Sequence, residues 1–243
     1  MEVIDGNWTL FGLDSTDPSC LTTVEKAEKF IEEIGILPLF KNEIEGFSLE
    51  EHTDPSCWWC GDRGKDPWEW RTVIAGKQKV LYGKFFNKKA GFVSRELVPD
   101  FLNYRRDGYD FDALYEDGKA SRRQRKIMLN FLDENADCRI MSNVLKEQAG
   151  FGPKGEKGYD GVITSLMMQG YLCNSDFRKR IGRNGEPYGW DVAEYATPES
   201  ILGQSYVTSK YKDEPKESFE RLKARIRKHF PTATDKEILK VLK

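Results

Sequence analysis

The order of helical and strand patterns over residues 119–197 constrains the fold of this chain more than any other feature. An amphipathic helical pattern comes first, with apolar side chains at Ile127, Met128, Phe131 and Leu132. A short strand, two more helical patterns and two alternating strands around an Asn-Gly turn follow. This order predicts a winged helix, which is a helix-turn-helix unit with a β-hairpin as its wing.

The second and third helices of this unit have recognisable ends. Ser142 is expected to cap the second helix, and Gly170 is expected to stop the third, which runs within residues 158–170. In winged-helix proteins the third helix normally lies in the major groove, and the hairpin lies over the backbone or the minor groove. The pattern therefore predicts a unit that can bind double-stranded DNA.

Basic side chains fall at three points of this unit that would face phosphates. They begin the first helix, precede the third helix and surround the tip of the hairpin. Charge runs usually only solvate a surface, so the interpretation rests on their shared placement in one motif. The candidate nucleic-acid-binding residues are Arg122, Arg123, Arg125, Lys126, Lys154, Lys157, Arg178, Lys179, Arg180 and Arg183.

Charge is distributed unevenly along the chain, although the net charge is only −2. Residues 1–75 carry about 16 acidic and about 6 basic side chains, and the rest of the chain carries about 24 acidic and about 32 basic ones. A polyanion would be repelled by the first part and attracted by the second. A chain whose two halves simply attract each other would show the same asymmetry.

The most unusual stretch is residues 52–71, which contains four of the six tryptophans. Indole faces beside carboxylates suit a pocket that stacks a flat ligand or an extruded base and performs acid–base chemistry on it. The alternative is a tryptophan-rich part of the core in which aspartates cap turns. The candidate residues are Trp58, Trp59, Trp68 and Trp70 for stacking, and Asp62, Asp66 and Glu69 for catalysis, either to stabilise an oxocarbenium-like sugar or to activate water.

Two cysteines of this stretch, Cys57 and Cys60, form a CxxC motif. Zinc needs four ligands, for which His52 and the distant Cys20 are the candidates. A second CxxC is missing from the sequence, so idle thiols are favoured, and neither a metal nor a cofactor is expected. The odd total of five cysteines indicates reduced cytoplasmic thiols rather than a disulfide framework.

The predicted fold class is α+β, in three parts. An acidic, aromatic-rich region of mixed helices and strands spans residues 1–118, the winged helix spans 119–197, and C-terminal helices at 198–243 pack on the core. The sequence lacks an apolar run near the roughly 18–20 residues that a membrane span needs. Its N-terminus is acidic and polar, so we expect a cytoplasmic location and no membrane partner.

Several segments spread over residues 35–240 resemble bacterial proteins of the AlkZ-related family. They are PLFKNEIEGFSLEEHT, WWCGDRGKDPWEWR, YGKFFNKKAGFVSRE, NYRRDGYDFDA, GYDGVITSLMMQGYL and GWDVAEYATPES. That family is placed near the AlkZ/YcaQ-type glycosylases, winged-helix enzymes that release alkylated bases and unhook interstrand crosslinks. The resemblance implies binding to damaged DNA without a cofactor. The Gln-x-Gln catalytic pair of those glycosylases is not found, since Met167-Met168-Gln169 lacks the first glutamine.

Several functions fit these patterns. The first is a DNA-binding winged-helix protein of DNA repair, with or without N-glycosylase activity on alkylated or crosslinked bases. The second is a non-enzymatic transcriptional regulator that binds an operator. The third is a protein-interaction module that does not bind DNA, and a small-molecule enzyme built on residues 52–71 is a further alternative.

Overall fold

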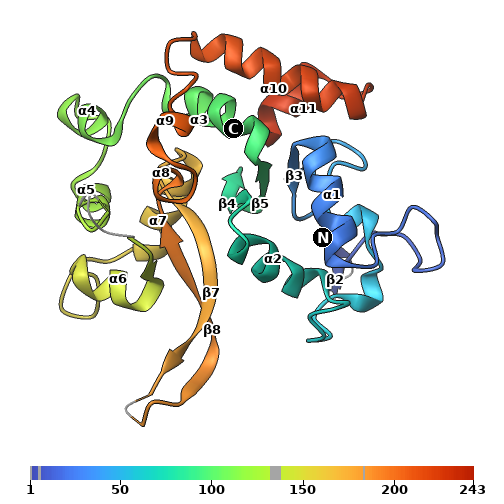
Figure 1. Cartoon of the computed structure of the whole chain (residues 1–243), viewed down its shortest axis with the longest axis horizontal. Helices are drawn as coiled ribbons and strands as arrows, with labels where there is room; N and C mark the ends of the chain where they lie inside the picture. The colour runs from blue at the N-terminus through green and yellow to red at the C-terminus, as the bar shows by residue number, and fades with distance from the viewer. Residues whose placement is uncertain (1, 5–6, 132–137, 183) are drawn as a thin grey trace.

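A computed structural model describes residues 2–4, 7–131, 138–182 and 184–243 (Figure 1). The chain is α+β, and its centre is a six-stranded antiparallel sheet with the strand order β3-β5-β4-β7-β8-β6. A separate two-stranded ribbon joins β1 (Glu2–Ile4) and β2 (Asn7–Thr9). The strands of the large sheet are β3 (Ile36–Pro38), β4 (Val80–Phe86), β5 (Lys89–Ser94), β6 (Ile140–Met141), β7 (Cys173–Ile181) and β8 (Pro187–Ala196).

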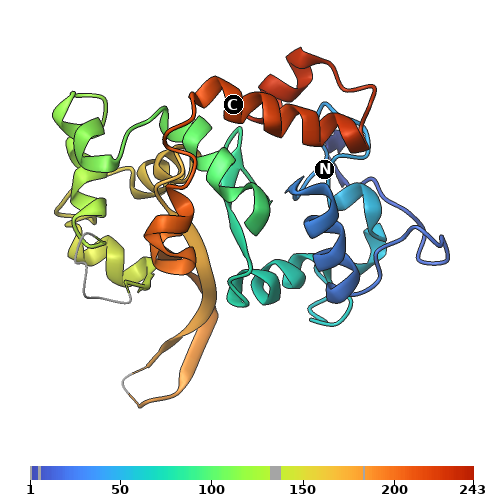
Figure 2. The same ribbon diagram turned by 45° about the horizontal axis from the view of Figure 1, so that its top comes forward.

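Helices surround the sheet, and α10 and α11 lie at the end of the molecule opposite the free tip of the β7–β8 hairpin (Figure 1, Figure 2). Short 3-10 turns occupy Glu50–His52, Pro55–Cys57 and Arg95–Leu97. The helices are α1 (Val24–Ile34), α2 (Pro67–Gly76), α3 (Val98–Arg106), α4 (Phe111–Glu116), α5 (Arg122–Met128), α6 (Ser142–Gln148), α7 (Tyr159–Met168), α8 (Pro198–Leu202), α9 (Gln204–Val207), α10 (Pro215–His229) and α11 (Asp235–Val241).

The first long helix leads directly into the sheet. Thr23 caps α1 by accepting a hydrogen bond from the backbone N–H of Lys26, and Gly35, with a φ of 90°, ends it. Its apolar face, which includes Ile31, is buried in the core. Strand β3 follows at once and pairs with β5, so α1 and β3 fix the N-terminal part of the chain to the sheet.

The helices and strands expected over residues 119–197 occur in the expected order, but two of their bounds differ. Helix α5 ends at Met128, and Leu132 lies outside the described residues. The capping prediction for Ser142 is wrong, because Ser142 is the first residue of α6 and Met141 occupies the cap position without a side-chain hydrogen bond. The chain passes from β6 straight into α6, which leaves no residue between the strand and the helix to act as a polar cap.

The sheet joins the N-terminal region to the β7–β8 hairpin. Strand β4 pairs with β7 through Tyr82 and Asn174, and α2 packs against β7. One hydrophobic core extends through both parts and includes Trp70, Phe92 and Leu166. The boundary predicted between residues 118 and 119 therefore crosses a shared sheet and a shared core.

Buried polar contacts hold the C-terminal helices against the body. Ser218 on α10 donates to Asp100 of α3 at 2.9 Å, and Arg221 donates to the same carboxylate at 2.7 Å. Thr234 and Glu237 form a capping box at the start of α11. Within the described residues, the helices lack the length and apolar composition that a membrane span requires.

Candidate nucleic-acid interface

The outer half of the β7–β8 hairpin is a free two-stranded ribbon that extends away from the rest of the molecule (Figure 1). Three of the basic residues predicted to bind nucleic acid, Arg178, Lys179 and Arg180, lie on it and are exposed. Arg183, the fourth, lies outside the described residues. The same ribbon carries Trp190, whose side chain is 89% exposed.

A bulge in β8 directs Trp190 towards solvent. Here residues 189–191 of β8 face a single residue of β7, and Gly189 has a φ of 73°. Such bulges bend a strand locally and re-aim its side chains. Asp191 in the same bulge forms an ion pair of 3.3 Å with Arg63 of the tryptophan-rich stretch. Trp190 therefore lies in a bulged part of the ribbon, where its neighbours from 186 to 189 are exposed as well.

The basic residues of the ribbon differ in the partners they already have. The guanidinium of Arg178 lies 2.9 Å from the carboxylate of Asp176, and this hydrogen bond raises the pKa of Arg178. The guanidinium carbon of Arg180 lies 5.4 Å from the ring centre of Tyr188, and among the described residues Arg180 makes no ion pair. Lys179 makes no ion pair with any residue that the structure describes. Lys179 and Arg180 are thus the cations most available to a phosphate.

The other predicted basic residues lie at the start of α5 and in the loop before α7. Arg123 donates to the backbone carbonyl of Lys157 at 3.1 Å, so the two clusters adjoin. Lys126 is occupied by an ion pair of 2.8 Å with Glu156. Lys154 is exposed on the loop. The structure therefore brings these two clusters together and leaves the hairpin as a separate basic surface.

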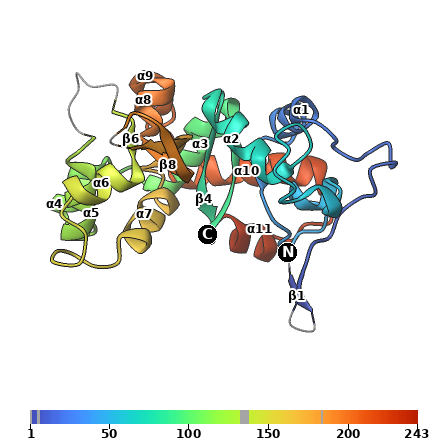
Figure 3. The same cartoon turned by 90° about the horizontal axis from the view of Figure 1, so that it is seen from below.

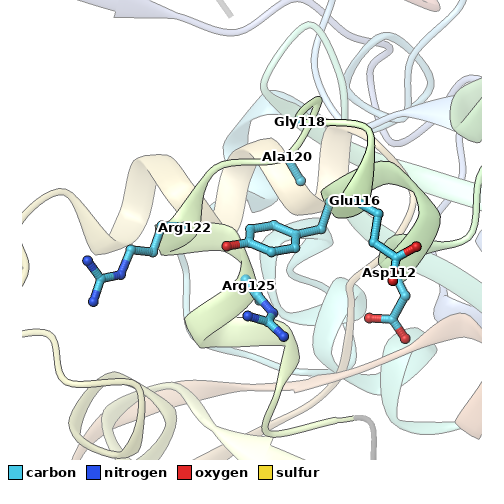
Figure 4. Close-up of a pocket in the computed structure, with 7 residues that line it drawn as sticks. Asp112, Glu116, Gly118, Ala120, Arg122 and Arg125 are labelled. Carbon is cyan, nitrogen blue, oxygen red and sulfur yellow. The ribbon is translucent and has the colours of Figure 1, made fainter.

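Arg122 and Arg125 line a hollow of about 420 Å³ between α4 and α5 (Figure 4). The guanidinium of Arg125 lies 4.6 Å from the ring centre of Tyr115, and Arg122 points outward. Asp112 and Glu116 line the opposite side. Because carboxylates face arginines across this hollow, it is a poor receptor for a polyanionic backbone.

The four tryptophans of residues 52–71 do not form one stacking pocket. Trp58 and Trp70 are buried in the core, at 5% and 1% exposure. Trp59 is 50% exposed on the surface. Trp68 is half-buried and lines a cavity. Trp68 is therefore the predicted stacking residue that the structure places at a cavity wall.

The three predicted catalytic carboxylates also lie apart from one another. Asp66 is fully buried and accepts hydrogen bonds from three backbone N–H groups, which caps α2. Asp62 is exposed and accepts from the backbone N–H of Gly64 at 2.9 Å. Glu69 lies 3.7 Å from the guanidinium of Arg63. These contacts are those of turn and helix capping and of a surface ion pair.

The residues considered for zinc binding are also dispersed. His52 Nε2 lies 2.7 Å from the carbonyl oxygen of Gly46. Cys20 is buried, Cys57 is half-buried and Cys60 is exposed, and all three are free thiols. Over the described ranges, no group of three or more His, Cys, Asp or Glu side chains is arranged to hold a metal ion.

The cavity beside Trp68 has a volume of about 430 Å³ and lies between α2, α7 and strands β4, β5, β7 and β8. Helix α7 and strand β4, which contact each other, are labelled in Figure 3. Much of its wall is aromatic, and the aromatic residues are Phe40, Trp68, Tyr82, Phe177 and Tyr195.

Arg71 of α2 forms part of this wall. Its guanidinium carbon lies 3.8 Å from the ring centre of Trp68 and 4.4 Å from that of Phe177. Burial raises the pKa of the neighbouring Tyr82 to about 12, and Arg71 opposes that rise. Among the described residues, Arg71 makes no ion pair with a carboxylate, and its buried Nε has no hydrogen-bond partner. The cavity thus holds a half-buried cation between aromatic faces.

Lysines stand at the mouth of the cavity. Lys84 and Lys88, both exposed, line it from the β4–β5 hairpin, and Asp160 and Thr164 line it from α7. These four residues also line a second hollow of about 610 Å³ over the outer face of α7. The concave surface therefore continues from the cavity onto α7.

Gln169, the residue nearest to a Gln-x-Gln pattern, has a packing role in this structure. Its Oε1 accepts a hydrogen bond of 2.6 Å from Nε2 of Gln124. The same Gln124 group lies 3.3 Å from Ser165 Oγ, so these contacts join the end of α7 to α5.

Comparison with known proteins identifies the family. The family model described as AlkZ related matches residues 21–243. The chain belongs to the AlkZ-related family. This confirms the family predicted from the sequence. The DNA glycosylase AlkZ of Streptomyces sahachiroi has a similar solved structure, with a TM-score of 0.45 and 9% identity, over 86% of this chain and 52% of that one. The chain thus spans about half the length of that glycosylase, and no curated protein matches it.

Sequence reasoning missed Trp190 and Arg71. A signal for Trp190 was available, because a tryptophan in the returning strand beside a basic hairpin tip is exposed to whatever the tip contacts. Local sequence carried no such signal for Arg71. Its contact with Phe177 joins α2 to β7, and the two residues are far apart in the chain.

Proposed function

We propose that residues 119–197 form a winged-helix unit that binds double-stranded DNA, as part of a protein of DNA repair. In this assignment α7 is the recognition helix and β7–β8 is the wing. The observation that carries the proposal is the ribbon that holds exposed Trp190 beside Lys179 and Arg180. Ammonium and guanidinium groups neutralise phosphates, and an exposed indole stacks on bases or enters between base steps.

The surface of α7 favours a repair protein over an operator-binding regulator. Direct reading of bases in the major groove relies mainly on Arg, Lys, Asn and Gln side chains. The positions of α7 that are not buried are instead Asp160 and Gly161, which are exposed, and Thr164, Ser165 and Met168, which are half-buried. We therefore propose that binding responds to damaged or distorted DNA structure rather than to base sequence.

Base release is the second part of the proposal. The family is described as AlkZ related, the AlkZ of Streptomyces sahachiroi is named a DNA glycosylase, and the carboxylate that lines the cavity is Asp160. A carboxylate there is placed to activate water more directly than Asp62, Asp66 or Glu69. Incubation with an alkylated duplex, followed by alkaline cleavage at abasic sites, tests the activity, and Asp160→Asn should abolish it. We propose a cytoplasmic location, where the free cysteines stay reduced.

DNA binding is tested with a short duplex, either plain or containing an abasic site or an alkylated base, across a salt series. We expect the Kd to rise steeply with salt and to be lower for the damaged duplex. The double variant Lys179→Ala and Arg180→Ala should weaken binding roughly tenfold and reduce the salt dependence. Arg178→Ala is the matched control, because Arg178 is already paired with Asp176.

Two results of this experiment would overturn the proposal or part of it. A folded wild-type protein that binds neither duplex at low salt is not a DNA-binding protein, and the unit at 119–197 would then serve protein contacts. Equal affinity for the damaged and the plain duplex, together with strong preference for one base sequence, would favour the regulator instead.

A further inference from the structure

We propose that the cavity between α2, α7 and the central sheet binds a single nucleotide unit, with its base against the aromatic wall and its phosphate at the lysine rim. The inference rests on the proposed function, because DNA supplies the nucleotide. Neither the family nor the fold assigns a ligand to this cavity, and the inference names the class of ligand that would bind there.

Arg71 is the first reason. A half-buried guanidinium without a carboxylate is costly, and the faces of Trp68 and Phe177 and a hydrogen bond with Tyr82 compensate that cost only in part. Its buried Nε lacks a partner within the described residues. A guanidinium presents several N–H donors in a planar fork that suits phosphate oxygens or the acceptor edge of a base. An anionic or acceptor-rich ligand would therefore complete the contacts of Arg71.

The shape and lining of the cavity point to a flat ring. Its volume of about 430 Å³ falls in the range of roughly 300–1,000 Å³ that is usual for small-molecule sites. The Phe40 and Trp68 rings are stacked, with centres 6.4 Å apart. Asn174 lines the same cavity and can both donate to and accept from the polar edge of a base. Burial raises the pKa of Tyr195, so that its hydroxyl stays protonated.

The mouth of the cavity separates the two ends of such a ligand. Lys84 and Lys88, which make no ion pair among the described residues, stand on the strand side. Asp160 stands on the α7 side and would repel a phosphate while accepting from an amino group of a base. The charges therefore orient the phosphate towards the lysines.

A nucleotide could reach the cavity free in solution or extruded from DNA. The cavity is continuous with the hollow over α7, where the proposed recognition helix would meet the duplex. An open route along α7 suits a nucleotide that remains attached to its strand. The experiment separates the two sources with a duplex that contains one bulged nucleotide, the matching paired duplex, and free dAMP as competitor.

Binding is measured by fluorescence anisotropy of the labelled duplexes. We expect the wild-type protein to bind the bulged duplex roughly tenfold more tightly than the paired one. Arg71→Gln and Lys88→Ser should each remove this preference, and Arg71→Gln, inside the cavity, should leave affinity for the paired duplex unchanged. Lys79→Ser, which alters an exposed lysine outside the cavity, is the matched control and should keep the preference.

Thermal unfolding checks each variant, and Lys88→Ser tests the cavity without disturbing the packing around Arg71. Equal binding of the two duplexes, or a preference that survives both variants in folded protein, would overturn this inference and leave the proposed function standing. Absence of binding to either duplex would instead overturn the proposed function. Loss of the preference on addition of dAMP would support a nucleotide site that also takes the free form, and its persistence would support the extruded form.

Discussion

Trp190 offers a test of the DNA contact at the level of one side chain. We expect Trp190→Ala to weaken binding to a plain duplex roughly tenfold, because stacking on a base is worth about 1–3 kcal/mol. The melting temperature should not change, since the indole is 89% exposed and contributes little to the core. Anisotropy of a labelled duplex and a thermal melt measure the two quantities.

Trp59 provides the matched control for that variant. It is also an exposed tryptophan, at 50%, and it contacts Trp58 edge-to-face on the N-terminal part of the molecule. Trp59→Ala should leave DNA affinity unchanged. If Trp59→Ala weakens binding and Trp190→Ala does not, the interface lies on the tryptophan-rich stretch, as the sequence first suggested.

Tyr82 determines part of the response to alkaline pH. Burial raises its pKa from about 10 to about 12, so the folded protein holds the phenol proton more tightly than the unfolded chain does. Its contribution to stability is complete below pH 10 and is lost as the pH rises towards 12, by up to about 3 kcal/mol. Urea unfolding at pH 8 and near pH 12 should therefore show a smaller loss in Tyr82→Phe. Tyr188→Phe, at an exposed position, should behave as wild type.

Side-chain chemistry predicted some residue roles and not others. The sequence offered two roles for Asp66, catalysis or turn capping. Its carboxylate caps α2 by accepting from the Trp68 N–H and holds the preceding loop by accepting from the N–H groups of Trp59 and Gly61. An Asp immediately before Pro67 at a helix start already carries that information locally. The local sequence around Arg71 does not indicate its role, because its surroundings depend on how Phe177 in β7 packs against α2.

At the scale of elements, the sequence patterns over residues 119–197 predicted the type and order of the helices and strands better than the residues at which they end. The third helix stops as expected, with Gly170 at a φ of 78°, and the hairpin turns at Gly185 with a φ of 80°. The first helix of the unit ends early, at Met128. The Asn130 side chain donates to the carbonyls of Lys126 and Ile127, and such bonds compete with continuation of the helix.

The attachment of α3 to α8 depends on one buried ion pair. Arg106, with 3% of its side chain exposed, pairs with Glu199 and donates to the Gly170 carbonyl at 2.7 Å and to the Tyr211 hydroxyl at 2.6 Å. Burial lowers the pKa of Arg106, but Glu199 outweighs that effect and raises it. We expect Glu199→Gln to lower the free energy of unfolding by about 3 kcal/mol, because it leaves a buried cation without its counter-charge.

An exposed ion pair gives the comparison for Glu199→Gln. Lys210 pairs with Asp213 at 3.5 Å on the surface, and Lys210→Ala should cost less than about 1 kcal/mol. Urea titrations of the two variants at neutral pH would measure both changes in the free energy of unfolding. Equal effects of the two variants would mean that hydrogen bonds to Gly170 and Tyr211 alone hold Arg106.

At the scale of the whole molecule, one interpretation of the charge asymmetry is that the acidic and basic parts attract each other. Glu43 pairs with Lys240 of α11 at 2.5 Å in this sense, and Arg63 pairs with Asp191 of the hairpin with the opposite polarity. The two halves therefore attract each other at specific points. Lys179 on the ribbon stays outside these pairs, so the basic surface proposed for DNA is not consumed by them.

The central sheet should also make unfolding cooperative, because it joins the two parts of the chain. Strand β4 pairs with β7 across the boundary predicted between residues 118 and 119, and Trp70 and Leu166 share one core. We therefore predict a single cooperative transition in urea, with coincident midpoints by tryptophan fluorescence and far-UV circular dichroism. Four of the six tryptophans lie within residues 52–71, so fluorescence reports mainly on the N-terminal part, whereas circular dichroism reports on all helices. Separate midpoints would show that the two parts fold independently. Coincident midpoints would show that the two parts unfold as one unit, as expected from the β4–β7 pairing and the shared core.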